Sequence, residues 1–162
     1  MHCSVARTLD IIGEWWTLLI LRDAFYGVRR FEAFREHLGI SRKVLTSRLQ
    51  RLTQEDILKK VAYQENPVRF EYRLTPKGLD LLPILLSIMK WGDKWQTLPD
   101  EMPVVFTHKT CGHETAPTVV CSHCQEELFA RDMQPKAGPG AKLQDIERLR
   151  QASINSKLFL ED

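Results

Sequence analysis

Four potential metal ligands occur in two pairs in the second half of the chain. Two residues separate the members of each pair, and the four residues are His108, Cys111, Cys121 and Cys124. Zinc favours tetrahedral sites built from cysteine thiolates and histidine nitrogens. The spacing therefore predicts one structural zinc ion. Only nine residues separate the two pairs, so the alternatives are that the site is a tight hairpin or that it is absent. His113 or His123 is an alternative ligand to His108.

The Cys121-Ser-His-Cys124 segment also has the spacing of a thiol-disulfide oxidoreductase. That motif normally opens a helix after a strand in a βαβ unit, and no such unit is predicted around residues 117–124. A zinc hydrolase is disfavoured as well, because four protein ligands leave the metal no open position for substrate. We therefore predict that the chain is not an enzyme, and a protein-binding adaptor is the other alternative.

A second group of residues, between Ser41 and Gln50, has side chains of the types that read DNA. Leu45, Leu49 and Leu52 recur at helical spacing, and Ser41 can cap the helix that they define. With these leucines inward, the outward residues are Arg42, Lys43, Thr46, Ser47 and Gln50. Such a helix fits the major groove, where arginine or lysine reaches guanine and glutamine pairs with adenine. The alternative is an ordinary solvated helix face.

Basic residues are concentrated around this helix. Between Arg29 and Lys60 the chain has nine basic residues and four acidic ones, although its formal net charge is only +2. We predict that Arg29, Arg30 and Arg51 contact phosphates and that Arg69 reaches an adjacent minor groove. The local charge therefore favours double-stranded DNA as the partner. The full predicted interface is Arg29, Arg30, Ser41, Arg42, Lys43, Thr46, Ser47, Gln50, Arg51 and Arg69.

Hydrophobic periodicity places the polar helix within a helix-turn-helix arrangement. Gly39 is predicted to end one helix, and Ser41 is predicted to begin the next. Two helices joined by a short turn that contains glycine form the helix-turn-helix motif. The four helices expected in this part of the chain cover approximately residues 5–12, 15–25, 31–38 and 42–52.

A β-hairpin and a leucine-rich helix are predicted to follow. Strands at residues 59–64 and 70–74 flank an Asn-Pro turn signal and would form a wing. The Thr75-Pro76 pair opens a fifth helix that runs to about residue 95, with a kink at Pro83. The expected fold class is therefore α+β and mainly helical: a winged helix-turn-helix domain with a small knuckle-like extension.

Composition changes divide the chain into three predicted segments. Residues 1–98 form the DNA-binding and dimerisation domain, residues 99–134 form the Cys/His-rich segment, and residues 135–162 form a linker and a last helix. The chain has no apolar run of the roughly 18 residues that a membrane-spanning helix needs, so we predict no membrane contact. The first residues do not resemble a secretory leader, and we expect a cytoplasmic protein.

Four runs of residues in the first part of the chain carry a family resemblance. They are Cys3-Ser-Val-Ala-Arg-Thr-Leu-Asp-Ile-Ile-Gly-Glu-Trp-Trp-Thr-Leu-Leu-Ile-Leu-Arg22, Arg30-Phe-Glu-Ala-Phe34, Ile40-Ser-Arg-Lys-Val-Leu-Thr-Ser-Arg-Leu49 and Tyr72-Arg-Leu-Thr-Pro-Lys-Gly78. Together these runs resemble the HxlR-type bacterial regulators, which are related to the MarR family. The resemblance implies a dimeric winged-helix protein that binds DNA and regulates transcription. Arg42 departs from the family, which often has proline at that position.

The resemblance also implies that two copies pair through residues 5–25 and 79–95. These segments have more bulky apolar side chains than a small domain needs for its own core, namely Trp15, Trp16, Leu85, Ile88, Met89, Trp91 and Trp95. A two-fold dimer presents its reading helices about 34–36 Å apart and requires a near-palindromic operator. A self-contained core is the alternative.

Cys3 is the candidate for a regulatory signal. It lies just before the first helix, where unpaired backbone amides and the nearby Arg7 favour a thiolate. Some HxlR-type regulators sense oxidants or electrophiles through a cysteine at this place, so the resemblance implies that Cys3 is a sensor. The alternatives are an unreactive cysteine at the dimer seam and a small-molecule effector that binds elsewhere.

Overall fold

The computed structural model describes residues 3–98 and 101–148. The chain forms two compact units, which divide between Pro117 and Thr118. The three sequence segments predicted above divide the chain at other points and stay a prediction. None of the helices described is long and apolar enough to cross a membrane.

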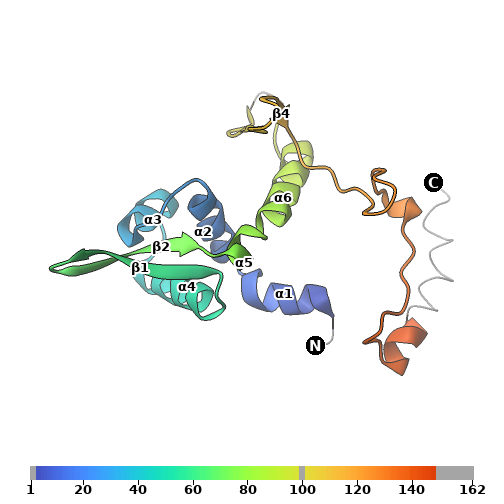
Figure 1. Ribbon diagram of the computed structural model, residues 1–162, viewed down its shortest axis with the longest axis horizontal. Helices are drawn as coiled ribbons and strands as arrows, with labels where there is room; N and C mark the ends of the chain where they lie inside the picture. Colours follow the sequence, from blue (N-terminus) through green and yellow to red (C-terminus); the bar gives the residue numbers. More distant parts are fainter. Residues whose placement is uncertain (1–2, 99–100, 149–162) are drawn as a thin grey trace. The chain divides into compact units, whose positions relative to one another are not determined.

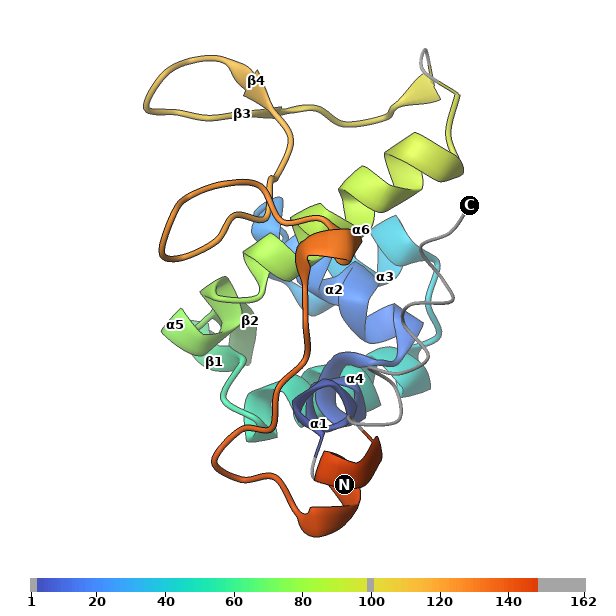
Figure 2. The ribbon, with the colours of Figure 1, turned by 90° about the vertical axis from the view of Figure 1, so that its right-hand side faces the viewer.

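The first unit is built around α2, which contacts α1, α3, α4 and α6 (Figures 1 and 2). The first four helices are α1 (Ser4–Ile12), α2 (Trp15–Phe25), α3 (Phe31–Leu38) and α4 (Arg42–Gln54). The buried apolar side chains form one cluster: Ile12, Ile20, Leu21, Phe34, Ile40, Leu45, Leu49, Leu52, Ile57 and Leu58. Of the α4 residues, only Leu45, Leu49 and Leu52 belong to this cluster, so the core packs against one side of the helix.

The turn between α3 and α4 has the predicted end and start signals. Gly39 follows α3 with φ 62°, a left-handed conformation that glycine adopts without the cost of a Cβ. Ser41 caps α4, because its Oγ accepts a hydrogen bond from the Val44 N–H at 3.3 Å. The short turn therefore sets the angle at which α4 leaves α3, and the helix-turn-helix prediction is confirmed.

The wing is a two-stranded antiparallel hairpin of β1 (Leu58–Glu65) and β2 (Val68–Leu74). Its register places Leu58 opposite Leu74 at the base. The Tyr72 N–H donates to the Arg29 carbonyl oxygen at 2.8 Å, so the chain before α3 pairs with β2. The distal half of the hairpin extends beyond the helices (Figure 1).

The fifth helix is broken rather than kinked. It consists of α5 (Pro76–Leu79), which Thr75 caps, and α6 (Leu82–Trp95), which has Pro83 in its first turn. The sequence pattern predicts one continuous helix with a kink over these residues, and that prediction is wrong. Proline lacks an N–H and has φ preset for a helix start, so it favours the beginning of a new helix over a bend within one.

Residues 101–148 contain little regular structure. A two-stranded hairpin of β3 (Phe106–Thr107) and β4 (Glu114–Thr115) belongs to the first unit. The second unit contains the 3-10 helix η2 (Ala130–Asp132) and a helical segment at residues 143–148. The predicted last helix begins there, and its part beyond residue 148 lies outside the described residues. No residue from 101 to 148 is buried.

Candidate nucleic-acid interface

The outer face of α4 carries the predicted base-reading side chains. Leu45, Leu49 and Leu52 have no exposed surface and fix the inner face of the helix. The exposed residues of the predicted reading surface are Ser41, Arg42, Lys43, Thr46, Ser47 and Gln50. The Thr46 hydroxyl donates to the Arg42 carbonyl oxygen at 2.8 Å and can still accept a hydrogen bond. The outer face of α4 therefore offers both hydrogen-bond donors and hydrogen-bond acceptors to a DNA groove.

Arg42 is held at the start of α4 by a residue of α3. Its guanidinium hydrogen-bonds to Glu32 Oε1 and lies 5.1 Å above the centre of the Phe31 ring. The other carboxylate oxygen of Glu32 accepts from Arg35 Nε at 2.8 Å. Desolvation raises the pKa of Glu32, but hydrogen bonds and charge from Arg35 and Arg42 outweigh it and lower this pKa below its usual value. Glu32 is therefore ionised and orients both arginines.

Arg29 and Arg30 connect the helix-turn-helix to the wing. Both side chains are exposed, and Arg30 forms an isolated β-bridge with Glu71 of β2. The Arg30 guanidinium lies 4.6 Å from the centre of the Tyr63 ring on β1. This cation–π contact holds the arginine against the wing without using its hydrogen-bond donors.

Arg51, near the end of α4, already has acidic partners. Its guanidinium lies 3.1 Å from Glu55 and 3.8 Å from Asp10 of α1. Such exposed ion pairs contribute roughly 0–1 kcal/mol each, so a phosphate can replace one of them at small cost. Arg48, which was not among the predicted contacts, is partly buried and lies 3.3 Å from Glu14.

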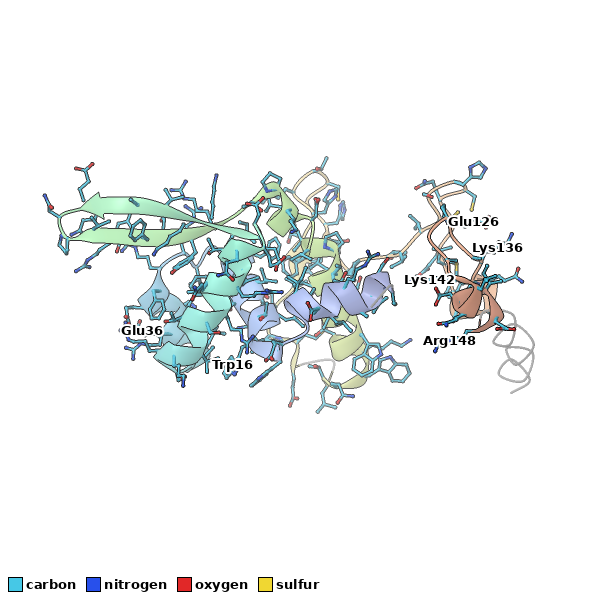
Figure 3. All side chains as sticks on the ribbon, turned by 90° about the horizontal axis from the view of Figure 1, so that it is seen from below. Trp16, Glu36, Glu126, Lys136, Lys142 and Arg148 are labelled. Carbon is cyan, nitrogen blue, oxygen red and sulfur yellow. The ribbon has the colours of Figure 1, made fainter. Side chains whose placement is uncertain are left out.

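The wing carries further basic side chains. Arg69 is exposed and pairs across the hairpin with Gln64, close to its tip. Figure 3 shows side chains projecting from both faces of this part of the hairpin. Lys60 lies 4.2 Å above the Phe70 ring, and Lys59 is exposed beside it. The sequence prediction of the DNA interface did not include these two lysines, although both lie in the strand predicted over residues 59–64, where successive side chains point to opposite faces.

The remaining predicted residues lie outside this surface. Cys3 is exposed immediately before α1, and the nearby Arg7 guanidinium donates to the Ser4 hydroxyl at 3.4 Å. All four cysteines of the chain are free thiols. Within the part of the chain that the structure describes, no three His, Cys, Asp or Glu side chains group around one metal position. Zinc binding therefore stays a prediction.

The Cys121–Cys124 turn was weighed above as a redox-active dithiol. Backbone hydrogen bonds from Cys124 and His123 hold the pKa of the Cys121 thiol below its usual value. The residues that follow form a turn and an isolated bridge between Val120 and Glu127, rather than the helix that a thiol-disulfide oxidoreductase places after its dithiol. The local structure gives no support to that enzyme class.

Comparison with known proteins supports the same conclusion as the geometry. The HxlR-like helix-turn-helix family matches residues 11–100. An uncharacterized HTH-type transcriptional regulator of Mycobacterium tuberculosis is 46% identical over 139 residues, which are 86% of this chain and 88% of that protein. YdeP of Bacillus subtilis, also an uncharacterized HTH-type transcriptional regulator, is 34% identical over 101 residues, which are 62% of this chain and 79% of that protein.

Solved structures with the same fold include further regulators. The candidate transcription factor PA1607 has a TM-score of 0.75 and 36% identity, and the similarity covers 84% of this chain and 95% of that one. The redox regulator HypR in its oxidized form has a TM-score of 0.55 and 33% identity, and the similarity covers 59% of this chain and all of that one. The 139-residue match to the mycobacterial relative is too long to end with the winged helix, so it includes part of the extension. The chain therefore belongs to the HxlR-like helix-turn-helix family of transcriptional regulators and is not an enzyme.

Proposed function

We propose that this protein is a homodimeric regulator that binds a near-palindromic DNA operator in a sequence-specific manner. The observation that carries the proposal is the outer face of α4, whose exposed polar side chains are flanked by Arg30 and by the wing. Base contacts from Lys43, Thr46, Ser47 and Gln50 give specificity, with Ser41 and Arg42 at the helix start. Phosphate contacts from Arg29, Arg30 and Arg51, and a minor-groove contact from Arg69, give most of the affinity. As a regulator of chromosomal genes it acts in the cytoplasm.

Three single substitutions separate base reading from backbone binding. Lys43→Ala and Gln50→Ala are expected to lower operator affinity about 5- to 150-fold, which corresponds to roughly 1–3 kcal/mol for a lost base contact, while affinity for random DNA falls less. Arg30→Ala is expected to weaken both kinds of binding by similar factors and to reduce the salt slope by about 1. Lys136→Ala, at an exposed lysine of the second unit, serves as the control. Equal losses on operator and random DNA for all three interface variants contradict the assignment.

The homodimer is supported by apolar surface on α1 and α6. α6 has no buried residue, and several large apolar side chains of both helices are exposed. The most exposed of them are Val5, Leu9, Ile88, Trp91 and Trp95, each about half or more exposed. Monomeric proteins rarely leave a patch of this kind open. Trp91→Glu is expected to convert the dimer to monomers in sedimentation experiments, whereas Gln96→Glu, just beyond α6, leaves the dimer intact.

Two observations support regulation by a signal. Cys3 is an exposed free thiol, and the structurally similar HypR is a redox regulator. We propose that oxidant or electrophile chemistry at Cys3 changes operator affinity. Diamide treatment is expected to alter operator binding of the wild-type protein but not of Cys3→Ser. An equal response of both proteins excludes Cys3 as the sensor.

A small-molecule effector is the second candidate signal. A mainly apolar cavity of about 460 Å³ lies between α2, α6 and residues 103–106, with Arg22 and Asp93 at its wall. Cavities of a few hundred cubic ångströms hold small ligands with an apolar body and one polar group. Leu86→Trp, which fills this space, is expected to abolish a ligand-induced rise in melting temperature while operator binding persists.

A further inference from the structure

The cavity between α2, α6 and residues 103–106 lies within the first unit and is lined mainly by apolar side chains. α2 contributes Leu18 and Leu19, and α6 contributes Leu85, Leu86 and Met89. All five residues are partly buried. The volume of about 460 Å³ falls within the range of roughly 300–1,000 Å³ found for sites that bind small organic molecules. An apolar body therefore fits this space, and the other lining residues determine which polar group that body carries.

Aromatic residues also line this cavity. They are Phe25 and Tyr26 at the end of α2 and Phe106 of β3. The ring centres of Tyr26 and Phe106 lie 6.2 Å apart, with an angle of 37° between the ring planes. Aromatic rings attract organic cations, because the face of each ring carries a negative partial charge. The rings therefore favour a ligand with a positive group over a ligand with a negative one.

Among the described residues, the charged side chains that line the cavity belong to Arg22 and Asp93. Arg22 is already paired, because its Nε and one terminal nitrogen donate to Asp23 Oδ1 at 3.0 Å and 2.7 Å. The Asp23 side chain is only 3% exposed, and a buried carboxylate that loses its cation is strongly destabilising. Arg22 and Asp23 therefore form a neutral pair beside the cavity, and the arginine is not free to bind a ligand carboxylate.

Asp93 is partly buried and has no such partner. Within residues 3–98 and 101–148, no basic side chain lies within 4.0 Å of its carboxylate. The lysines near it on α6 make other contacts: Lys90 Nζ donates to the Pro117 carbonyl oxygen at 2.7 Å, and Lys94 Nζ lies 4.8 Å from the centre of the Trp95 ring. Neither lysine lines the cavity. Since Arg22 is neutralised, Asp93 leaves one net negative charge at the cavity wall.

We propose that this cavity binds an organic cation with an apolar body, whose positive group pairs with the Asp93 carboxylate. The apolar wall buries the body, while the aromatic rings and Asp93 stabilise the charge. α6 forms one wall of the cavity and also carries part of the apolar surface of the proposed dimer, so the bound cation changes how two copies pair on DNA. This regulatory effect rests on the proposed dimeric DNA-binding function, whereas binding of the cation does not.

The test uses the full chain and two probes of similar size and shape but opposite charge, tetraphenylphosphonium and tetraphenylborate. Calorimetric titration without DNA measures binding alone, so its outcome does not depend on the DNA-binding function. The phosphonium is expected to bind at one site per chain, at least about 5-fold more tightly than the borate, a factor that one ion pair supplies. Asp93→Asn removes the charge at nearly constant volume and is expected to weaken phosphonium binding by about the same factor. Asp80→Asn, at an exposed aspartate outside the cavity, is the matched control and is expected to bind as wild type does.

Further variants locate the site. Leu86→Trp fills the cavity and is expected to abolish phosphonium binding, and Asp93→Lys is expected to reverse the preference towards the borate. Trp91→Glu lies outside the cavity and is expected to bind the phosphonium as a monomer; loss of binding in this variant places the site between two copies and overturns its assignment to one chain.

The proposal is overturned if the wild-type protein binds neither probe or prefers the borate, or if Asp93→Asn binds the phosphonium as tightly as wild type. Operator affinity is then measured with and without the phosphonium. A change that is absent in Asp93→Asn supports the regulatory effect. Binding of the phosphonium without any change in operator affinity contradicts the regulatory effect and leaves the cation site established.

Discussion

Substitution of Gly78 by alanine tests how the wing is attached to the reading helix. The Cβ of an alanine at this position would lie 2.3 Å from the Ile57 carbonyl oxygen and 3.0 Å from Leu74 Cδ2. The first contact is with backbone, and the Gly78 N–H is also fixed by its hydrogen bond to Thr75 Oγ1 at 3.1 Å. Thr75 Oγ1 in turn donates to the Asp56 carbonyl oxygen at 2.6 Å. The clash therefore has no flexible side chain to absorb it.

Overpacking of this kind costs about 1–3 kcal/mol. For a chain of this length 1 kcal/mol lowers the melting temperature by roughly 2–4 °C, so Gly78→Ala is expected to lower it by about 2–12 °C in a thermal unfolding experiment. Because the junction includes Ile57, which lies between α4 and β1, operator affinity is expected to fall as well. Gly138→Ala is the control, since nothing lies within 4 Å of its added Cβ. A melting temperature of Gly78→Ala equal to that of wild type refutes the described packing of this junction.

Three further predictions concern the start of the reading helix and the Glu32 carboxylate beside it. Ser41→Ala removes the hydroxyl that accepts the Val44 N–H, and it is expected to lower the free energy of unfolding by about 0.5–2 kcal/mol in urea titrations. Ser41→Gly is expected to lower it by only a few tenths of a kcal/mol. Equal losses of unfolding free energy in the two variants contradict a capping role. Glu32→Gln releases Arg42 and removes a negative charge beside it, so affinity for random DNA is expected to rise and discrimination between operator and random DNA to fall. Unchanged binding to both operator and random DNA contradicts the orienting role of Glu32. The pKa of Glu32 is lowered in the folded protein, so the stabilising contribution of its carboxylate is complete above the pKa of an unfolded glutamate and is lost as pH falls through the lowered value. NMR titration of the Glu32 carboxyl carbon in the wild-type protein and in Arg42→Ala measures this shift. Equal Glu32 pKa values in the two proteins contradict the ion pair with Arg42.

Local signals in the sequence predicted the elements that form the interface. Gly39 and Ser41 determine the turn between α3 and α4, because a left-handed glycine and a capping hydroxyl act within a few residues. The leucine stripe of α4 predicted which face is buried, and all three leucines have no exposed surface. The break before α6 was missed because Pro83 was interpreted within a continuous leucine-rich pattern, although proline near a helix start has the opposite meaning.

Features that depend on how elements cross were not predictable from spacing. The contact of Arg42 with Glu32 joins residues ten positions apart and requires the observed angle between α3 and α4. The cation–π contact of Arg30 with Tyr63 requires the pairing of the chain before α3 with the wing. The left-handed conformation of Gln125, with φ 64°, was not predictable either, because this conformation favours glycine.

Selection of bound fragments from genomic DNA tests the central claim most directly. The purified full-length protein is incubated with sheared DNA, and the enriched fragments are footprinted across a salt series. We expect a protected near-palindrome whose half-sites lie one or a small number of helical turns apart. The logarithm of the binding constant is expected to fall by about 0.9 for each phosphate contact when the salt concentration rises tenfold. No enrichment at low salt, or enrichment without a common sequence, contradicts the assignment of α4 as a base-reading helix.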